Sequence, residues 1–319
     1  MAPSAPSWRE VSVPVGWGFL RGKTCHLGEP RGGAYLRVLA LHGWLDNANS
    51  FDALLPLLPE GLEVLSLDLA GHGLSDHLPV GGRYDVMTHV VYLREAVQRL
   101  GWSGFVLLAH SLGALIANYY TALYPRDVRA LVVLDYLRPF HKEDRLATWR
   151  AENGLMQREE QGRGRGRRAY SEDEALARMV EARKGGYNKE LPNLDKDAAR
   201  ILLPRAARRV DGGYVWRHDE KARTRYSMLY GDDNWMYVIS HITCPVMAVR
   251  ADDGLCQQPD DAYAPVLEAY RKSARVFRFD RIPGGHHVHL THPDRVAPSV
   301  SHFLTHDVLA TQDEGASKL

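Results

Sequence analysis

The stretch that decides the fold is Phe105–Gly113, which reads FVLLAHSLG. Its first five residues are apolar and have the length of a buried strand, and apolar residues at helical spacing begin directly after Ser111. A serine between a strand and a helix, with small residues two positions before and after it, is typical of a sharp turn that presents a nucleophile. Ala109 and Gly113 are those small residues. We therefore predict that Ser111 is a catalytic nucleophile; the plainer alternative is a serine that only caps the following helix.

A histidine-rich segment near the end of the chain offers the base that a serine hydroxyl needs. It begins with Ile282–His286 (IPGGH) and continues with His287, His289 and His292. We assign the base to His286, because it directly follows the two glycines and precedes the last helical pattern; His287 is the alternative. The four histidines also suggest a zinc site, but their spacing does not match H-E-x-x-H and no acidic residue lies among them. We therefore expect no metal and no cofactor.

The acid that orients such a histidine is expected between the serine and the histidine in the chain. Asp135 directly follows the apolar run Val128–Leu134, and two further acids, Asp252 and Asp253, follow Val246–Arg250. We favour Asp135, because the other two come slightly early after their strand. The sequence leaves both positions open.

The loop His42-Gly43-Trp44 follows another apolar run and is the expected source of a backbone N–H donor to the oxyanion. We predict that the N–H groups of Trp44 and Leu112 form the oxyanion hole, since Leu112 opens the helix after the serine. The predicted substrate contacts are His42, Gly43, Trp44 and His110.

Apolar runs alternate with amphipathic stretches along most of the chain, which is typical of a mostly parallel, doubly wound α/β sheet. An opening hairpin is expected over Val11–Val13 and Trp17–Cys25. The expected strands after it are Leu36–Leu41, Leu62–Leu67, Phe105–Ala109, Val128–Leu134, Val246–Arg250 and Arg275–Phe279. Helices are expected over 85–100, 112–124 and 293–304, with Asp85 as a cap.

The pattern changes over residues 137–241, which are rich in Arg, Glu and Lys and hold no strong strand run. A capping box at Ser171–Glu174 and a helical stretch over Asp197–Arg209 indicate helices here. We predict an α/β core over 1–136 and 242–310, an inserted helical cap over 137–241, and a flexible tail over 311–319. The large aromatic residues expected to line a pocket under this cap are Trp149, Tyr187, Trp216 and Trp235.

The amino-acid composition and the last three residues indicate which binding partners and which cell compartment to expect. Lys and Arg number 40 and Asp and Glu 39, a balance that argues against a nucleic-acid binder, and the short run Gly162–Arg168 is expected to be a solvated loop. Three scattered cysteines indicate reduced thiols, and no run approaches the ~18 apolar residues of a membrane span. The last three residues, Ser317-Lys318-Leu319, match the peroxisomal address S-K-L, so we expect a soluble protein that binds the peroxisomal import receptor and resides in peroxisomes, with the cytoplasm as a second location.

Four motifs together resemble the serine hydrolase-like proteins of the α/β-hydrolase superfamily: His42–Asn47 (HGWLDN), Asp68–Ser75 (DLAGHGLS), His110–Gly113 (HSLG) and Pro283–His286 (PGGH). The resemblance covers about residues 10–305 and implies a doubly wound sheet with a helical cap in a peroxisomal or cytosolic protein. Relatives often place the acid after the strand that precedes the cap, which favours Asp135. Haloalkane dehalogenases and epoxide hydrolases, which are broadly similar, need an aspartate nucleophile, so Ser111 disfavours their chemistries.

The function expected from these residues is hydrolysis of a carboxylic ester or thioester of a small or lipid-like acyl group through an acyl-enzyme. The alternative is a catalytically silent protein that keeps the fold and binds a small apolar ligand or a partner, because a fold does not guarantee an activity. Ala109, which departs from the usual glycine, supports the alternative, whereas the serine and histidine together favour an enzyme.

Overall fold

The computed structural model describes residues 6–138, 145–161, 168–183, 193–223, 231–254 and 260–309. The S-K-L tail, Tyr187 and the Arg-rich run over 162–167 lie outside the described residues, as does the side chain of Trp149. In the part of the chain that is described, no helix combines the length and the apolar content needed to cross a bilayer.

The centre of the molecule is an eight-stranded sheet with the order β1-β2-β4-β3-β5-β6-β9-β10. β1 and β2 form an antiparallel hairpin, β2 pairs antiparallel with β4, and every remaining neighbour pairs in parallel. The bounds are β1 Arg9–Val15, β2 Gly18–Leu27, β3 Leu36–Leu41, β4 Leu62–Leu67, β5 Phe105–His110, β6 Val128–Leu134, β9 Val246–Asp253 and β10 Phe277–Gly285. The predicted α/β-hydrolase fold with a mostly parallel, doubly wound sheet is confirmed.

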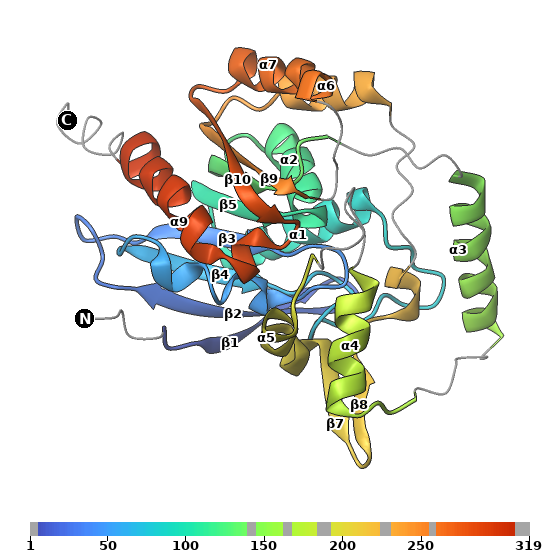
Figure 1. Ribbon diagram of the computed structural model, residues 1–319. Helices are drawn as coiled ribbons and strands as arrows, with labels where there is room; N and C mark the ends of the chain where they lie inside the picture. Colours follow the sequence, from blue (N-terminus) through green and yellow to red (C-terminus); the bar gives the residue numbers. More distant parts are fainter. Residues whose placement is uncertain are drawn as a thin grey trace.

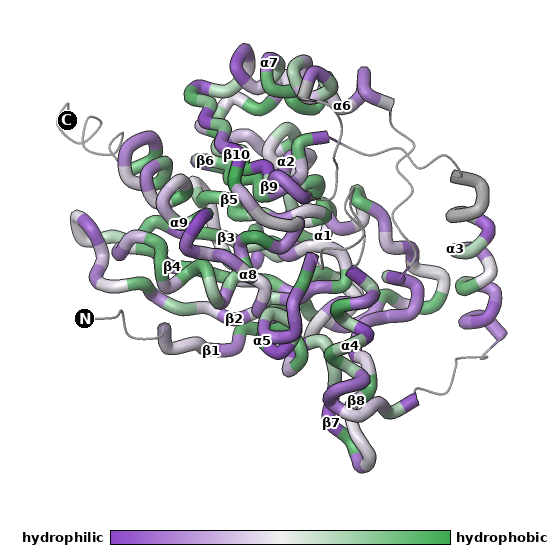
Figure 2. The backbone as a smooth tube through the Cα atoms, viewed as in Figure 1, coloured by the Kyte–Doolittle hydropathy of each residue, from purple (hydrophilic) through white to green (hydrophobic). Residues whose placement is uncertain are grey.

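Helices cover both faces of this sheet (Figure 1). One face carries α1 (Val86–Leu100), α2 (Leu112–Leu123), α6 (Asp232–Ser240) and α7 (Ala264–Ser273), and the other carries α9 (Pro293–His302). Successive residues of a strand point to opposite faces, so Leu39 and Leu41 of β3 join the first core and Val38 and Ala40 join the second. The central strands are accordingly mostly hydrophobic (Figure 2), as expected of a parallel sheet buried on both faces.

Between β6 and β9 the chain forms α3 (Arg145–Glu160), α4 (Glu172–Ala182), α5 (Lys196–Ala206), the hairpin β7 (Ala207–Val210) and β8 (Gly213–Trp216), and α6. The predicted capping box at Ser171 is confirmed. α4 and α5 share a small core of their own, whereas Trp235 of α6 packs in the main core. Trp235 is 1% exposed and its indole N–H donates to Leu137 O, so it belongs to the core and not to a pocket wall.

Two expectations for this insertion were wrong. The helix predicted to reach Arg209 ends at Ala206, and a β-hairpin follows where no strand was expected. The reason is local: Asp211-Gly212 joins the two strands, and Gly212 has a φ of 85°, which glycine adopts in a tight turn without a steric cost. The predicted boundaries of the core and cap stay predictions.

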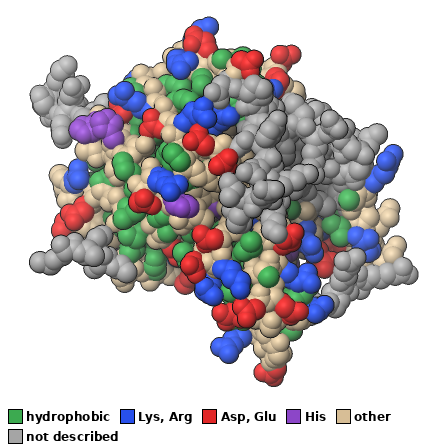
Figure 3. Space-filling view, in the orientation of Figure 1, with side chains coloured by type: hydrophobic (Ala, Val, Ile, Leu, Met, Phe, Trp, Pro, Cys, Tyr) green, Lys and Arg blue, Asp and Glu red, His purple; other side chains and the backbone are tan. Residues whose placement is uncertain are grey.

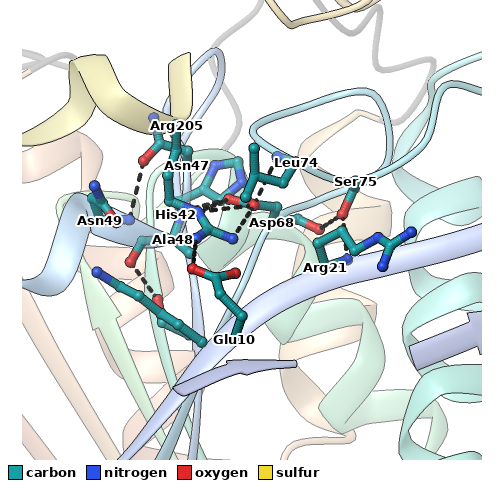
Figure 4. A network of polar contacts seen from close by, with 12 residues as sticks. Glu10, Arg21, His42, Asn47, Ala48, Asn49, Asp68, Leu74, Ser75 and Arg205 are labelled. Atoms are coloured by element: carbon teal, nitrogen blue, oxygen red, sulfur yellow. Dashed lines mark hydrogen bonds and ion pairs between the residues drawn. The ribbon is translucent and has the colours of Figure 1, made fainter. Parts of the chain in front are cut away.

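A buried ion pair fastens α5 to the sheet (Figure 4). Asp68, at the carboxyl end of β4, is fully buried and accepts hydrogen bonds from Nη2 (2.7 Å) and Nε (3.1 Å) of Arg205. The same carboxylate accepts from the backbone N–H groups of Ala48 (2.7 Å) and Leu74 (2.9 Å). Because all four donors converge on one carboxylate, α5 is locked to the loops after β3 and β4.

On the face shown in Figure 3, basic and acidic side chains are intermixed.

Candidate active site

Ser111 occupies the sharp turn between β5 and α2. Its φ of 52° and ψ of −117° lie in a region that non-glycine residues rarely adopt, and its N–H donates to Leu134 O at 3.1 Å. Gly113 is required for this turn, because a Cβ there would stand 2.1 Å from Leu41 O. Ala109 pairs with Leu41 and Val133 in the sheet and is fully buried, so a small methyl group is tolerated at that position.

Ser111, His286 and Asp135 form one hydrogen-bonded chain from three distant parts of the sequence. The Ser111 hydroxyl lies 2.8 Å from His286 Nε2, and His286 Nδ1 lies 2.6 Å from Asp135 Oδ2. The carboxylate only accepts, so the proton of the imidazole is on Nδ1 and Nε2 is left to accept from the serine. All three side chains are buried, with between 6% and 7% of each residue exposed.

Asp135 is held at the carboxyl end of β6 by the neighbouring strand β9. Its N–H donates to Val249 O (2.8 Å), its Oδ1 accepts from the N–H of Ala251 (2.9 Å), and its φ is 49°. Asp252 instead forms an ion pair with Arg281 at 2.9 Å on the surface. The structure therefore brings Asp135 to the histidine and leaves Asp252 outside the site.

The two predicted oxyanion donors follow the carboxyl ends of β3 and β5, which are parallel neighbours in the sheet. Leu112 is the first residue of α2, so its N–H has no acceptor within the helix and belongs to the positive end of the helix dipole. Trp44 follows Gly43 at the end of β3, and its indole N–H donates to Ala222 O at 2.7 Å. The indole is thus fixed against the insertion, which orients the loop that carries the Trp44 backbone.

The side chains of His42 and His110, predicted to touch substrate, have internal roles instead. Both are 0% exposed. His42 donates from Nδ1 to Gly43 O (2.7 Å) and accepts the N–H of Leu69 on Nε2 (3.0 Å), while His110 donates from Nε2 to His286 O (2.8 Å). Because both rings are buried and three of their four nitrogens bond the backbone, these histidines shape the loops around Ser111.

Comparisons with known proteins agree with the fold described above. The family model described as alpha/beta hydrolase fold matches residues 37–293. A serine hydrolase-like protein of Danio rerio is 33% identical over 301 residues, which cover 92% of this chain and 88% of that relative. The chain belongs to the α/β-hydrolase family. A probable serine hydrolase of Drosophila melanogaster is 31% identical over 304 residues, covering 93% of this α/β-hydrolase and 88% of the relative.

Solved structures show the same fold. The hypothetical protein PA1622 from Pseudomonas aeruginosa superposes with a TM-score of 0.73 at 27% identity, over 93% of this α/β-hydrolase and 99% of the other chain. A thioesterase domain from the curacin biosynthetic pathway superposes with a TM-score of 0.71 at 21% identity, over 92% and 98% of the two chains. The second likeness shows the fold alone.

Beside the serine and histidine, this α/β-hydrolase holds a second buried polar cluster that the sequence did not predict. Asp46 Oδ2 accepts from Nε2 of His287 (3.0 Å), and Asp46 Oδ1 accepts from Nη2 (2.7 Å) and Nε (3.0 Å) of Arg183. Burial alone would raise the pKa of Asp46, but His287 and Arg183 outweigh it and hold that pKa well below its usual range. Burial lowers the pKa of His287. His287 therefore faces Asp46, which leaves His286 alone on Ser111.

Asp46, His110 and His287 are also the group in the described part of the chain that could hold a metal ion, with one ligand atom from each within 4.8 Å of the others. The carboxylate of Asp46 already receives a guanidinium on one oxygen and an imidazole N–H on the other. Arg183 thus supplies the positive charge that a metal would bring, so these residues fit a hydrogen-bonded cluster better than a metal centre. The four-histidine site considered from the sequence is not assembled, since His289 bonds Ser50 and His292 bonds Thr291.

Proposed function

We propose that this α/β-hydrolase cleaves a carboxylic ester or thioester of a small or lipid-like acyl group through an acyl-enzyme at Ser111. The observation that carries the proposal is the buried chain of hydrogen bonds from Ser111 to His286 (2.8 Å) and from His286 to Asp135 (2.6 Å). A serine hydroxyl is a weak nucleophile unless a base lies within hydrogen-bond reach and a third group orients that base. Both conditions are met at the turn between β5 and α2.

The steps follow from these contacts. Ser111 Oγ attacks the acyl carbon while His286 Nε2 takes the hydroxyl proton, and Asp135 stabilises the imidazolium that forms. The backbone N–H groups of Leu112 and Trp44 are the proposed donors to the oxygen that becomes negative. The imidazolium then gives its proton to the leaving alcohol or thiol, and a water molecule, activated by His286, releases the acid and restores the serine.

The backbone strain at Ser111 supports this assignment over a capping role. Ser111 stands at the N-cap position of α2, but its hydroxyl makes no hydrogen bond to the start of that helix and faces His286 instead. Residues in unusual backbone conformations cost of the order of 1–3 kcal/mol and gather at functional sites. The names of the relatives, which are serine hydrolase-like proteins, agree with a serine nucleophile.

The test is the intact mass of the protein after exposure to a fluorophosphonate, which adds covalently to an activated serine. We expect one adduct on the wild type and on the surface control Ser240→Ala, and none on Ser111→Ala or His286→Ala. Hydrolysis of p-nitrophenyl esters and acyl thioesters of increasing chain length would then define the acyl group. Folded wild-type protein that takes up no adduct would overturn the proposal and favour a silent binding protein.

A further inference from the structure

The backbone of His286 is fixed on both sides by side chains from distant segments. Its N–H donates to Asn193 Oδ1 (3.1 Å), and its carbonyl oxygen accepts from His110 Nε2 (2.8 Å). His110 is fully buried and Asn193 is 6% exposed. His286 lies between β10 and the short helix α8 (Val288–Thr291), so neither a sheet ladder nor a helix holds it.

The two residues before His286 are glycines, which makes such outside support necessary. Gly284 has a φ of 144°, a conformation that only glycine adopts readily, and glycine has the largest conformational freedom of all residues. Gly285 lies so close to Asn193 that a Cβ on it would be 3.0 Å from Asn193 Oδ1. Asn193 therefore packs directly on the flexible approach to the proposed base.

Asn193 is in turn linked to the cluster around Asp46. Its Nδ2 donates to Arg183 O at 3.1 Å, and Arg183 binds Asp46 through Nε and Nη2 and Leu45 O through Nη2 (2.7 Å). Asp46 accepts from His287, which is covalently next to His286. The contacts close a ring, which we call the histidine clamp: Asn193, Arg183, Asp46 and His287, closed through His286. Arg183 and Asn193 come from the insertion between β6 and β9, at the end of α4 and before α5.

We propose that Asn193 and Arg183 are positioning residues that hold the His286 imidazole between Ser111 and Asp135. This inference rests on the proposed function, in which His286 is the base. Neither residue is hydrogen-bonded to Ser111 or Asp135; each acts on the backbone of the histidine loop, Asn193 directly and Arg183 through Asp46 and His287. A catalytic side chain must be held to within about 0.5 Å of its productive position by such supports. The insertion between β6 and β9 therefore supplies two residues that hold the proposed base in place.

The test compares Asn193→Leu, which removes both hydrogen bonds at similar size, with the matched control Asn234→Leu in the full chain. Asn234 is half-buried on α6 and donates to Tyr119 Oη, away from His286. Two quantities are measured: the rate of fluorophosphonate labelling, and the low-field proton NMR signal of His286 Nδ1–H, identified by its loss in Asp135→Asn. We expect Asn193→Leu to label about ten- to a hundred-fold more slowly and to broaden or shift that signal. Asn234→Leu should keep both at wild-type values.

Arg183→Lys tests the role of Arg183, and it also tests the proposal if the Asn193→Leu variant does not fold. Lysine keeps the positive charge beside Asp46 but loses the bidentate geometry, so a smaller fall in labelling rate and a smaller change in the signal are expected. A wild-type labelling rate and an unchanged signal in the folded variants would overturn the positioning role. The proton signal needs no reaction, so it tests the clamp even if wild-type protein fails to label, an outcome that would count against the proposed function alone.

Discussion

Gly254 packs so tightly against Asp135 that a β-carbon at residue 254 would lie 2.3 Å from Oδ2 of the carboxylate. That oxygen accepts the hydrogen bond from His286 Nδ1–H. The space left by the glycine therefore sets the position of the proposed acid, and a side chain there would push the carboxylate off the imidazole.

Gly254→Ala should slow hydrolysis of a p-nitrophenyl ester about ten- to a hundred-fold, because small displacements of a catalytic group cost rates of that size. The backbone at Gly254 is not in the left-handed region, so the expected loss comes from the displaced carboxylate and not from backbone strain. Gly231→Ala is the matched control, since a Cβ there has no described residue within 4 Å. Equal rates in the two variants would show that Asp135 tolerates the displacement.

Asp135→Asn should reduce the rate of ester hydrolysis about 10⁴-fold, the loss seen when the acid of a serine protease triad becomes an amide that favours the wrong imidazole tautomer. Asp252→Asn is the control, because that carboxylate pairs with Arg281 at the surface. Initial rates at a fixed enzyme concentration check both variants. A larger loss in Asp252→Asn than in Asp135→Asn would reassign the acid.

Arg205→Met should lower the free energy of unfolding by about 3–5 kcal/mol, because it leaves the buried carboxylate of Asp68 without its cation. The exposed pair of Arg200 with Asp197 gives the matched comparison, and Arg200→Met should change stability by at most about 1 kcal/mol. Urea denaturation followed by circular dichroism measures both. Similar midpoints for the two variants would mean that the α5 anchor contributes little to stability.

The sequence predicted the central sheet well, because a strand buried on both faces is mostly apolar. β3, β4 and β6 match the expected ranges residue for residue. The edge strand β10 was placed over Arg275–Phe279 but runs from Phe277 to Gly285, since it alternates charged and apolar residues and ends in glycines. The hairpin β7–β8 was missed although Asp211-Gly212 marks its turn.

The residues of the site could be predicted only where a short local motif is typical of the chemistry. The small residues around Ser111 and the glycines before His286 are such motifs. The structure brings the side chains of Ser111 and His286 together. The choice between Asp135 and the pair Asp252 and Asp253 depended on which strand end faces the histidine, which periodicity does not encode. Arg183 and Asn193 bond partners 137 and 93 residues away, so nothing in their own segments indicates their contacts.

Acid should destabilise the protein through buried neutral histidines, of which His72 is the clearest. Burial, with a smaller contribution from His42, lowers the pKa of His72 from 6.5 to about 3, and its Nδ1 lies 2.9 Å from Ala70 O. Because a histidine in the unfolded chain has a pKa near 6.5, the unfolded chain binds a proton at this residue between about pH 6.5 and pH 3, whereas the folded chain does not. The stabilisation is therefore complete above pH 6.5 and is lost as the pH falls from 6.5 toward about 3.

At pH 5 this single group should cost about 2 kcal/mol of unfolding free energy relative to pH 7. His72→Gln removes the titration, so the difference in unfolding free energy between pH 7 and pH 5 should shrink by about that amount, whatever the variant's stability at pH 7. The exposed His241, changed to glutamine, is the control and should leave the pH difference unaltered. Urea denaturation at pH 7 and pH 5 measures these unfolding free energies. If they differ between the two pH values by the same amount in wild type and in His72→Gln, His72 binds its proton at pH 5 in the folded protein as it does in the unfolded chain.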